Sequence, residues 1–267
     1  MILNQGKAYR VRRLYDNSGA IFAVPMDHGF TIGPVKGLIN IDNTVRNIFS
    51  GGASCVIVHK GLIKSIFQQI PRSNGLIVHL SGSTNLSPKS TFKISTGSVL
   101  EACKLGADAI SCHVNIGVDN DFEMIENMSK FTTEANNYGI PVLAMMYVRN
   151  NVGIDNNNPD ALAHAARIAE ESGADIVKIN MTPNIKDFDE VLQGMGIPVV
   201  VAGGSRMDNF DEFISRIKYS IISGATGISI GRNIFQSNDP SKAMSSIKEA
   251  VIEGLKETDR YENFSNS

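Results

Sequence analysis

Short apolar runs recur along the whole chain, each bounded by glycine or another turn-forming residue. They are rich in valine and isoleucine and show no alternation with polar residues, which is typical of strands buried on both faces. We predict eight strands from these runs, at 20–29, 54–61, 76–82, 109–117, 142–147, 175–180, 198–204 and 227–233. A protein with this many fully buried strands needs a covering layer of helices.

Segments with the apolar spacing of amphipathic helices separate most of the runs, for example at 121–139, 160–175 and 209–226. Several end in a Gly-Ala or Gly-Ile step, where glycine readily takes the left-handed conformation that follows a helix. Eight strand–helix units of the α/β class predict a parallel sheet closed into a (β/α)8 TIM barrel. A doubly wound open sheet is the alternative, but no G-x-G-x-x-G turn follows the first strand. The weakest helix is predicted at 62–74.

We predict one domain over 1–267, with the N-terminal segment 1–19 capping the barrel and a polar tail at 256–267. The tail has few apolar residues, so we expect it to be disordered or to form an oligomer contact. The asparagine-rich segment 148–160 follows the fifth strand and is a candidate lid over the mouth of the barrel.

Composition narrows the class of partner. With 42% hydrophobic and 19% charged residues the chain is typical of globular proteins, and a net charge of -2 favours neither nucleic acid nor an acidic membrane as partner. Its three cysteines have no paired spacing, which favours a reducing compartment. Neither a signal sequence nor a membrane span is evident, so we expect a cytoplasmic protein that acts on small molecules.

Polar residues gather where the predicted strands end. In barrels of this class the active site lies at the C-terminal ends of the strands, so this pattern predicts a reaction site. In strand order the residues are Asp27 and His28, His59 and Lys60, His79 and Ser81, His113 and Asn115, Tyr147 and Arg149, Lys178 and Asn180, Gly203 to Ser205, and Gly231 to Asn233.

Lys178 lies between β-branched residues in "DIVKIN", an unusual place for a charge. The ordinary interpretation is a strand-end lysine that extends its head into solvent. At the barrel mouth, however, burial and neighbouring cations such as Lys60 and Arg149 would lower its pKa and make the amine a nucleophile able to form a Schiff base with a carbonyl. Position alone makes Lys60 nearly as good a candidate as Lys178.

Two further side chains could move protons. Tyr147 ends the strand before that of Lys178, so the two could meet above the barrel, although a tyrosine there could equally be a core residue. Asp27 ends the first strand and could pair with the lysine or accept a proton from a substrate hydroxyl. Its ordinary interpretation is a loop-capping aspartate.

The last two strands end in the glycine-rich turns "VAGGSR" and "SIGRN". Backbone N–H groups in such turns bind anions, and the loops after strands seven and eight commonly hold phosphate in this fold. The predicted phosphate-binding residues are Gly203, Gly204, Ser205, Gly231 and Arg232, which imply a phosphorylated substrate.

Histidines in the first four strands offer a metal-dependent alternative. His28, His59, His79 and His113 could bind a divalent cation for a metal-dependent aldolase or hydrolase. The chain has no H-x-H pair among them and no clear carboxylate ligand beyond Asp27. We therefore predict neither a metal nor another cofactor.

The motifs "VPMDHGFTIGPVKGL", "VIVHKG", "LIVHLSGST", "LAMMYVR", "VVVAGG" and "GISIGRNIFQ" resemble the archaeal-type class I aldolase family related to deoxyribose-phosphate aldolase. The resemblance runs from about Arg10 to Ala250. Within the family, "PMDHG", "HKG", "HLS" and "AMMY" are most similar to the branch of 2-amino-3,7-dideoxy-D-threo-hept-6-ulosonate synthases and their bacterial antibiotic-pathway relatives. That branch joins a phosphorylated ketose-type donor to aspartate semialdehyde.

The resemblance implies roles that the residues alone left open. It makes Lys178, and not Lys60, the Schiff-base lysine, Tyr147 the proton-transferring residue and Asp27 the acid. It places the substrate among the glycine-rich turns, with His28, Lys60 and Arg149 as further binding residues, and it implies a homo-oligomer, often a decamer. The family's "KTxY" is replaced here by Ile179 and Met181, which we expect to lie near the substrate.

Two alternatives stay open. A class I fructose-bisphosphate aldolase of this type would usually carry Trp where this chain has Met145. A non-catalytic phosphosugar-binding protein would use the same glycine-rich turns without turnover.

Overall fold

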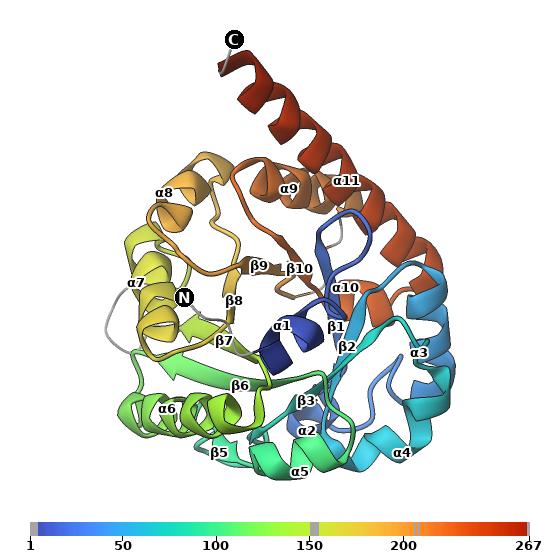
Figure 1. The fold of residues 1–267 in the computed structure, drawn as a ribbon, viewed down its shortest axis with the longest axis vertical. Coiled ribbons are helices and arrows are strands. Elements are labelled where there is room, and N and C mark those ends of the chain that lie inside the picture. Colours follow the sequence, from blue (N-terminus) through green and yellow to red (C-terminus); the bar gives the residue numbers. More distant parts are fainter. Residues whose placement is uncertain (1–4, 150–154, 206, 208, 266–267) are drawn as a thin grey trace.

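The computed structural model describes residues 5–149, 155–205, 207 and 209–265, and its centre is a closed barrel of parallel strands (Figure 1). Around the barrel the order is β1-β10-β9-β8-β7-β6-β3-β2. The strands are β1 Ile21–Pro25, β2 Cys55–Val58, β3 Gly75–His79, β6 Ala109–Ile116, β7 Val142–Val148, β8 Ile176–Asn180, β9 Val199–Ala202 and β10 Gly227–Ser229. The predicted TIM barrel is therefore confirmed, and the open-sheet alternative is wrong.

Helices surround the barrel and pack on the outward-facing side chains of the strands (Figure 1). The longer ones are α3 Ile41–Ser50, α6 Asp121–Tyr138, α7 Pro159–Glu171, α9 Phe210–Ile222 and α11 Pro240–Ser265, and the shorter ones are α2 Gly29–Ile32, α5 Val99–Lys104, α8 Phe188–Leu192 and α10 Arg232–Phe235. The weak helix expected at 62–74 is broken into η1 Lys60–Leu62, α4 Ile63–Ile66 and η2 Phe67–Gln69, and η4 Ile185–Asp187 precedes α8. No helix in the described residues is long and apolar enough to cross a membrane.

A two-stranded hairpin interrupts the connection after β3. It consists of β4 Ser81–Gly82 paired antiparallel with β5 Ile94–Ser95. The run predicted as one strand to residue 82 therefore ends its barrel pairing at His79 and then continues into the hairpin. This excursion brings residues 83–93 to the mouth end of the barrel.

The N-terminal segment closes the opposite end. Helix α1 Gln5–Val11 lies across the middle of the barrel in Figure 1, and Leu14 is fully buried with the inward-facing residues of the strands. The buried Lys7 ammonium lies 2.8 Å from the Asp175 carboxylate at the start of β8. The Arg13 guanidinium lies 2.6 Å from the Asp108 carboxylate at the start of β6.

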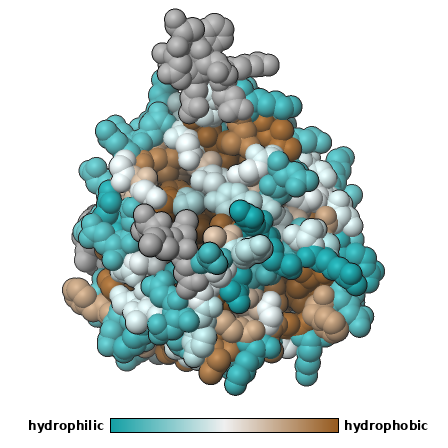
Figure 2. Space-filling view, in the orientation of Figure 1, coloured by the Kyte–Doolittle hydropathy of each residue, from teal (hydrophilic) through white to brown (hydrophobic). Residues whose placement is uncertain are grey.

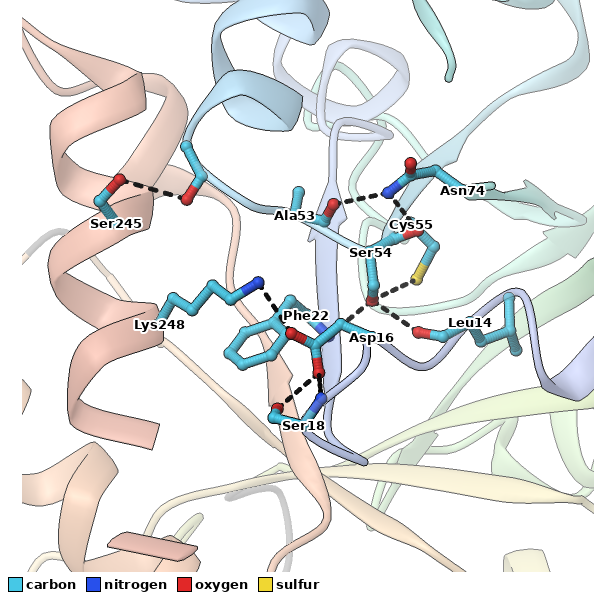
Figure 3. Close-up of polar contacts among 11 residues, drawn as sticks. Leu14, Asp16, Ser18, Phe22, Ala53, Ser54, Cys55, Asn74, Ser245 and Lys248 are labelled. Atoms are coloured by element: carbon cyan, nitrogen blue, oxygen red, sulfur yellow. Dashed lines mark hydrogen bonds and ion pairs between the residues drawn. The ribbon is translucent and has the colours of Figure 1, made fainter. Parts of the chain in front are cut away.

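Figure 3 shows how the chain after α1 is held at this end. The Ser54 hydroxyl donates to the carbonyl oxygen of Leu14 and accepts from the backbone N–H of Phe22. The Lys248 ammonium on α11 lies 2.7 Å from the Asp16 carboxylate and 5.1 Å from the centre of the Phe22 ring. The N-terminal segment is thus bonded to strands and to the last helix.

On the face in Figure 2, which is the face crossed by α1, hydrophilic residues cover most of the outline with apolar residues between them. Helix α11 extends from the barrel in Figure 1 and continues to Ser265, so the prediction of a disordered tail is wrong for 256–265. The alternative of an oligomer contact stays a prediction. Of the lid expected at 148–160, residues 150–154 lie outside the described residues.

Candidate active site

A cavity of about 680 Å³ opens at the C-terminal ends of the strands. Side chains on the strands alternate between the barrel interior and the helix layer, so every second residue near a strand end faces this cavity. Of the eleven residues predicted to act in catalysis or substrate binding, nine line it: Asp27, His28, Tyr147, Arg149, Lys178, Gly203, Gly204, Ser205 and Arg232. These residues come from five different strand ends and converge on one space.

Lys178 faces the cavity because of this alternation. Val177 and Ile179 on either side pack into the outer core, whereas Ile176, two residues earlier, belongs to the inner core. The Lys178 side chain is buried, with the residue 5% exposed, and its ammonium lies 6.0 Å from the centre of the Tyr147 ring. Ile179 thus faces away from the cavity, so the expectation that it lies near the substrate is wrong, whereas Met181 lines the cavity.

The Tyr147 ring is surrounded by nitrogen-bearing side chains. It stacks on His113 with ring centres 4.6 Å apart. Arg149 directly follows β7, and its guanidinium carbon lies 5.0 Å from the centre of the Tyr147 ring. Arg149 is oriented by a 2.8 Å hydrogen bond that its Nε donates to Asn115. The phenol is thus held between a histidine ring and two cationic side chains, Arg149 and Lys178, at a place where it can transfer a proton to or from a bound substrate.

Asp27 follows β1 and lies beside two imidazoles. Its carboxylate oxygens are 3.6 Å from His28 Nδ1 and 3.7 Å from His79 Nε2. Burial raises the pKa of this carboxyl, but the attraction of His79, His28 and Lys178 outweighs burial and holds the pKa well below its usual range. Asp27 is therefore ionised near neutral pH, and its Oδ1 has no hydrogen-bond partner within the described part of the chain.

The histidines near Asp27 and Tyr147 are kept neutral by their surroundings. Burial lowers the pKa of His79 to about 3, although Asp27 raises it, and burial holds the pKa of His113 well below its usual value. His79 Nδ1 lies 2.8 Å from the Ser111 hydroxyl, and His113 Nε2 lies 3.0 Å from the Asn115 side-chain oxygen. Within the described ranges, no three His, Cys, Asp or Glu side chains are grouped so that they could hold a metal ion.

The two glycine-rich turns lie side by side at the cavity wall. Asn233 donates from Nδ2 to the carbonyl oxygens of Gly203 and Ser205, at 3.0 and 3.1 Å, which fixes the first turn. Gly204 has a φ of 65°, in the left-handed region that suits glycine. Arg232 donates from Nη2 to the Gly204 carbonyl at 3.0 Å, while its buried Nε has no partner among the described residues.

Two of the predicted residues lie elsewhere. The Lys60 ammonium is 2.8 Å from the Glu101 carboxylate, both side chains are exposed, and Lys60 does not line the cavity. The structure therefore does not bring Lys60 to Lys178, because the chain turns away into η1 directly after His59. Gly231 supports the wall and is not part of the lining: a Cβ there would lie 2.8 Å from the His28 ring and 2.7 Å from the Pro25 carbonyl oxygen.

Two cationic cavity residues were not predicted. Lys93 enters from the hairpin, just before β5, and Arg216 enters from α9, where its Nη2 donates to the Thr182 carbonyl at 2.7 Å. Arg216 lies three residues after the buried Phe213, so its position on the apolar face of a helix was a usable signal. Lys93 stands in a polar loop with no periodicity, and the sequence carried no signal for it.

Comparison with known proteins agrees with this geometry. The model of the DeoC/LacD family aldolase matches residues 21–237. A 2-amino-3,7-dideoxy-D-threo-hept-6-ulosonate synthase of Archaeoglobus fulgidus is 42% identical over 235 residues, 88% of this chain and 86% of that protein. A 2-amino-4,5-dihydroxy-6-oxo-7-(phosphonooxy)heptanoate synthase of Streptomyces griseus is 31% identical over 246 residues, 92% of this chain and 90% of that protein.

The fold comparison points the same way. A solved structure of a Schiff-base-forming fructose-1,6-bisphosphate aldolase superposes with a TM-score of 0.84 at 27% identity, covering 92% of this chain and 99% of that one. The family match spans most of the barrel, and the sequence relatives span most of the chain. The chain belongs to the DeoC/LacD family of aldolases and is an enzyme of the class I aldolase or transaldolase type.

Proposed function

We propose that Lys178 forms a Schiff base with a phosphorylated ketose-type donor and that the enzyme transfers the resulting carbon nucleophile to aspartate semialdehyde. One observation carries this proposal. The buried Lys178 side chain lines the cavity, its ammonium lies 6.0 Å from the centre of the Tyr147 ring, and its charge acts on the ionised Asp27 carboxylate. A buried amine with proton-transfer groups beside it is the arrangement that iminium chemistry requires.

The steps follow from these groups. The neutral amine of Lys178 attacks the donor ketone, and loss of water from the carbinolamine leaves an iminium. Cleavage of the donor carbon–carbon bond, or removal of a proton from the adjacent carbon, then gives an enamine on the lysine. Asp27 takes the proton from the hydroxyl when the bond breaks, and Tyr147 takes or returns the carbon-bound proton. The enamine attacks the acceptor aldehyde, the new alkoxide gains a proton, and water releases the product from Lys178.

The glycine-rich turns supply the anion site. Gly203 to Ser205 follow β9, which pairs with the β8 strand that carries Lys178, and Arg232 follows β10, which pairs with β9 on its other side. The partnerless Arg232 Nε gives this wall a free cationic donor. A phosphate bound here would hold the donor carbonyl over the Lys178 amine.

The names of the sequence relatives support the choice of acceptor. Both describe seven-carbon acids with an amino group at the second carbon and a ketone at the sixth. An enamine made from that ketone bonds through the fifth carbon, so the first four carbons come from an aldehyde that carries an amino acid group. That aldehyde is aspartate semialdehyde.

Borohydride trapping tests the Schiff base. Incubation with a ketose phosphate and borohydride is expected to add the donor mass to the peptide containing Lys178, and Lys178→Met abolishes the adduct. Lys60→Met is the matched control, because Lys60 is also a strand-end lysine but lies outside the cavity. Full activity without any trapped adduct on Lys178 contradicts the proposal.

A class I fructose-bisphosphate aldolase is the second candidate, supported by the similar solved structure. Mass spectrometry of products from aspartate semialdehyde and a panel of ketose phosphates separates the two functions. A seven-carbon amino acid product supports the first candidate. Cleavage of fructose 1,6-bisphosphate alone, with no transfer to aspartate semialdehyde, supports the second.

We also propose a cytoplasmic homo-oligomer, with a decamer as the expected form. The support is the family to which the chain belongs and the long helix α11, which extends from the barrel in Figure 1. Sedimentation velocity of the purified protein tests this assembly, and a monomer at micromolar concentration contradicts it.

A further inference from the structure

The hairpin after β3 delivers a lysine to the cavity. Lys93 stands immediately before β5, is partly buried, and lines the cavity together with Arg149. Its ammonium donates to the Ser83 hydroxyl at 2.5 Å, a neutral partner in the same hairpin. No ion pair joins Lys93 to a carboxylate in the part of the chain that the structure describes.

Lys93 and Arg149 form a positive pair with too little negative charge around them. Burial lowers the pKa of the Lys93 ammonium and the charge of Arg149 lowers it further, while Asp27 raises it. Asp27 is the sole acidic residue among the described cavity-lining residues, and its charge already acts on the Lys178 ammonium. Two neighbouring, partly buried cations that share a remote carboxylate are stabilised by a bound anion.

The pair lies on the other side of Lys178 from the proposed phosphate site. Along the barrel, β8 stands between β9 and β10, which end in the glycine-rich turns, and β7, β6 and β3, which lead to Arg149, Asn115 and the hairpin. A donor carbonyl bound at Lys178 with its phosphate toward β9 and β10 therefore points its bond-forming carbon toward β7. The acceptor aldehyde has to approach from the side of Lys93 and Arg149.

The dimensions fit an amino acid aldehyde. The Tyr147 ring is close to both sites, with its centre 6.0 Å from the Lys178 ammonium and 5.0 Å from the Arg149 guanidinium carbon. In aspartate semialdehyde the carboxylate is three carbon–carbon bonds from the aldehyde carbon, roughly 4 Å. An aldehyde carbon bonded beside Tyr147 would therefore place its carboxylate near Arg149.

We infer that Lys93, with Arg149, binds the carboxylate of the acceptor aldehyde and that Lys93 is a specificity-determining residue for acidic acceptors. This inference rests on the proposed aldol transfer and deepens it. Arg149 supplies a planar fork that matches a carboxylate, and its Nε is already held by Asn115, so its remaining nitrogens can face the ligand. Lys93 supplies a second point charge from the hairpin.

Kinetics with two acceptors test the role of Lys93. In Lys93→Met the KM for aspartate semialdehyde is expected to rise about 10- to 100-fold, the loss typical of one charge-assisted hydrogen bond, while kcat/KM for the uncharged acceptor propanal changes less than about twofold. Lys93→Arg retains the charge and is expected to restore most of the affinity. Lys89→Met, at an exposed lysine of the same hairpin connection, is the control and behaves as wild type.

Several outcomes would overturn the inference. Equal losses for aspartate semialdehyde and propanal would make Lys93 a structural residue only. A rise in KM for glyceraldehyde 3-phosphate without a rise for aspartate semialdehyde would assign the pair to a phosphate instead of a carboxylate.

Two further measurements separate this inference from the proposed function. Borohydride trapping of the donor on Lys178 is expected to persist in Lys93→Met, because the donor does not reach the hairpin. L-Homoserine, the unreactive alcohol of the acceptor, is expected to stabilise the wild-type protein against heat but not Lys93→Met. If borohydride traps no donor on Lys178, but homoserine stabilises the wild type and not Lys93→Met, the proposed Schiff base is wrong and the role of Lys93 stands. If borohydride traps the donor on Lys178, but homoserine stabilises the wild type and Lys93→Met equally, the role of Lys93 is wrong and the Schiff base stands.

Discussion

Two buried lysines at opposite ends of the barrel have the same exposure and different surroundings. Lys7 and Lys178 are each 5% exposed. Lys7 forms an ion pair at 2.8 Å with Asp175, the residue that precedes β8, while Lys178 lies three residues further on, with no hydrogen bond or ion pair to another described residue. Burial alone therefore does not distinguish a structural lysine from a reactive one, whereas the presence or absence of a carboxylate partner does.

The same contrast extends to the two ends of the barrel. At the closed end, Arg13 pairs with Asp108 and the Ser54 hydroxyl both donates and accepts. At the mouth, several buried polar atoms lack partners in the described part of the chain: Asp27 Oδ1, His28 Nδ1, Asn156 Oδ1, Arg216 Nε and Arg232 Nε. Unsatisfied buried groups cost stability, so their concentration at one end is the physical mark of a binding site.

Replacing the unpaired lysine has the largest expected effect. Lys178→Met is expected to lower kcat/KM at least about a thousandfold, because it removes the nucleophile. Its melting temperature is expected to stay level or rise, since an apolar chain of similar volume replaces a buried charge. Steady-state kinetics and calorimetry measure both quantities. If Lys178→Met kept a tenth of the wild-type activity, Lys178 would not be the nucleophile, and the contrast between a reactive Lys178 and a structural Lys7 would be wrong.

Replacing Lys7, the lysine with an ion-pair partner, is expected to lower stability and to leave activity nearly unchanged. Lys7→Met leaves the Asp175 carboxylate partly buried with only the Val142 N–H as partner, and we expect the free energy of unfolding to fall by roughly 3 kcal/mol. Activity of the folded protein stays close to wild type. Adding Asp175→Asn to Lys7→Met should recover part of the loss, because the uncompensated charge is gone. Additive losses in the double variant would show that the ion pair is not the cause.

The partnerless guanidinium of Arg232 gives a smaller effect. Arg232→Met is expected to raise the KM for a ketose phosphate by about 30-fold, within the range for a charge-assisted hydrogen bond, and to leave the KM for the acceptor unchanged. Unphosphorylated dihydroxyacetone serves as the control donor, because it has no phosphate to lose. If both donors weaken equally, Arg232 shapes the Gly204 turn and does not contact the phosphate.

The neutral histidines predict a pH dependence at the mouth. Because burial lowers the pKa of His79 to about 3, below an unfolded value of about 6.5, the unfolded chain binds more protons between these values. Stability is then full above pH 6.5 and falls as pH is lowered toward 3, with a contribution from His79 of about 1 kcal/mol between pH 7 and 5.5. Denaturant titrations of His79→Gln should show a shallower decline. An unchanged slope would assign the acid sensitivity to other groups.

Much of this site followed from the alternation of strands and helices. Apolar runs that end in polar residues predicted both the barrel and the strand-end positions of Lys178, Tyr147 and Asp27, because a parallel barrel brings all its carboxyl ends together. Resemblance to a family was still needed to choose Lys178 over Lys60. The structure separates them on local grounds, since the chain turns into η1 after His59 and carries Lys60 to Glu101.

The residue pattern was enough to predict the fold class, the end of the barrel that carries the chemistry, and the glycine-rich turns, because hydrophobic period and turn chemistry are local properties of the chain. Which charges lie unpaired in the cavity could be seen only in the folded chain. Lys93 comes from an irregular hairpin and Arg216 from a helix face. The sequence pattern around each of them does not indicate which residues far along the chain lie next to it. Whether a buried lysine meets a carboxylate, as Lys7 does, or an open cavity, as Lys178 does, depends on contacts between residues far apart in the chain.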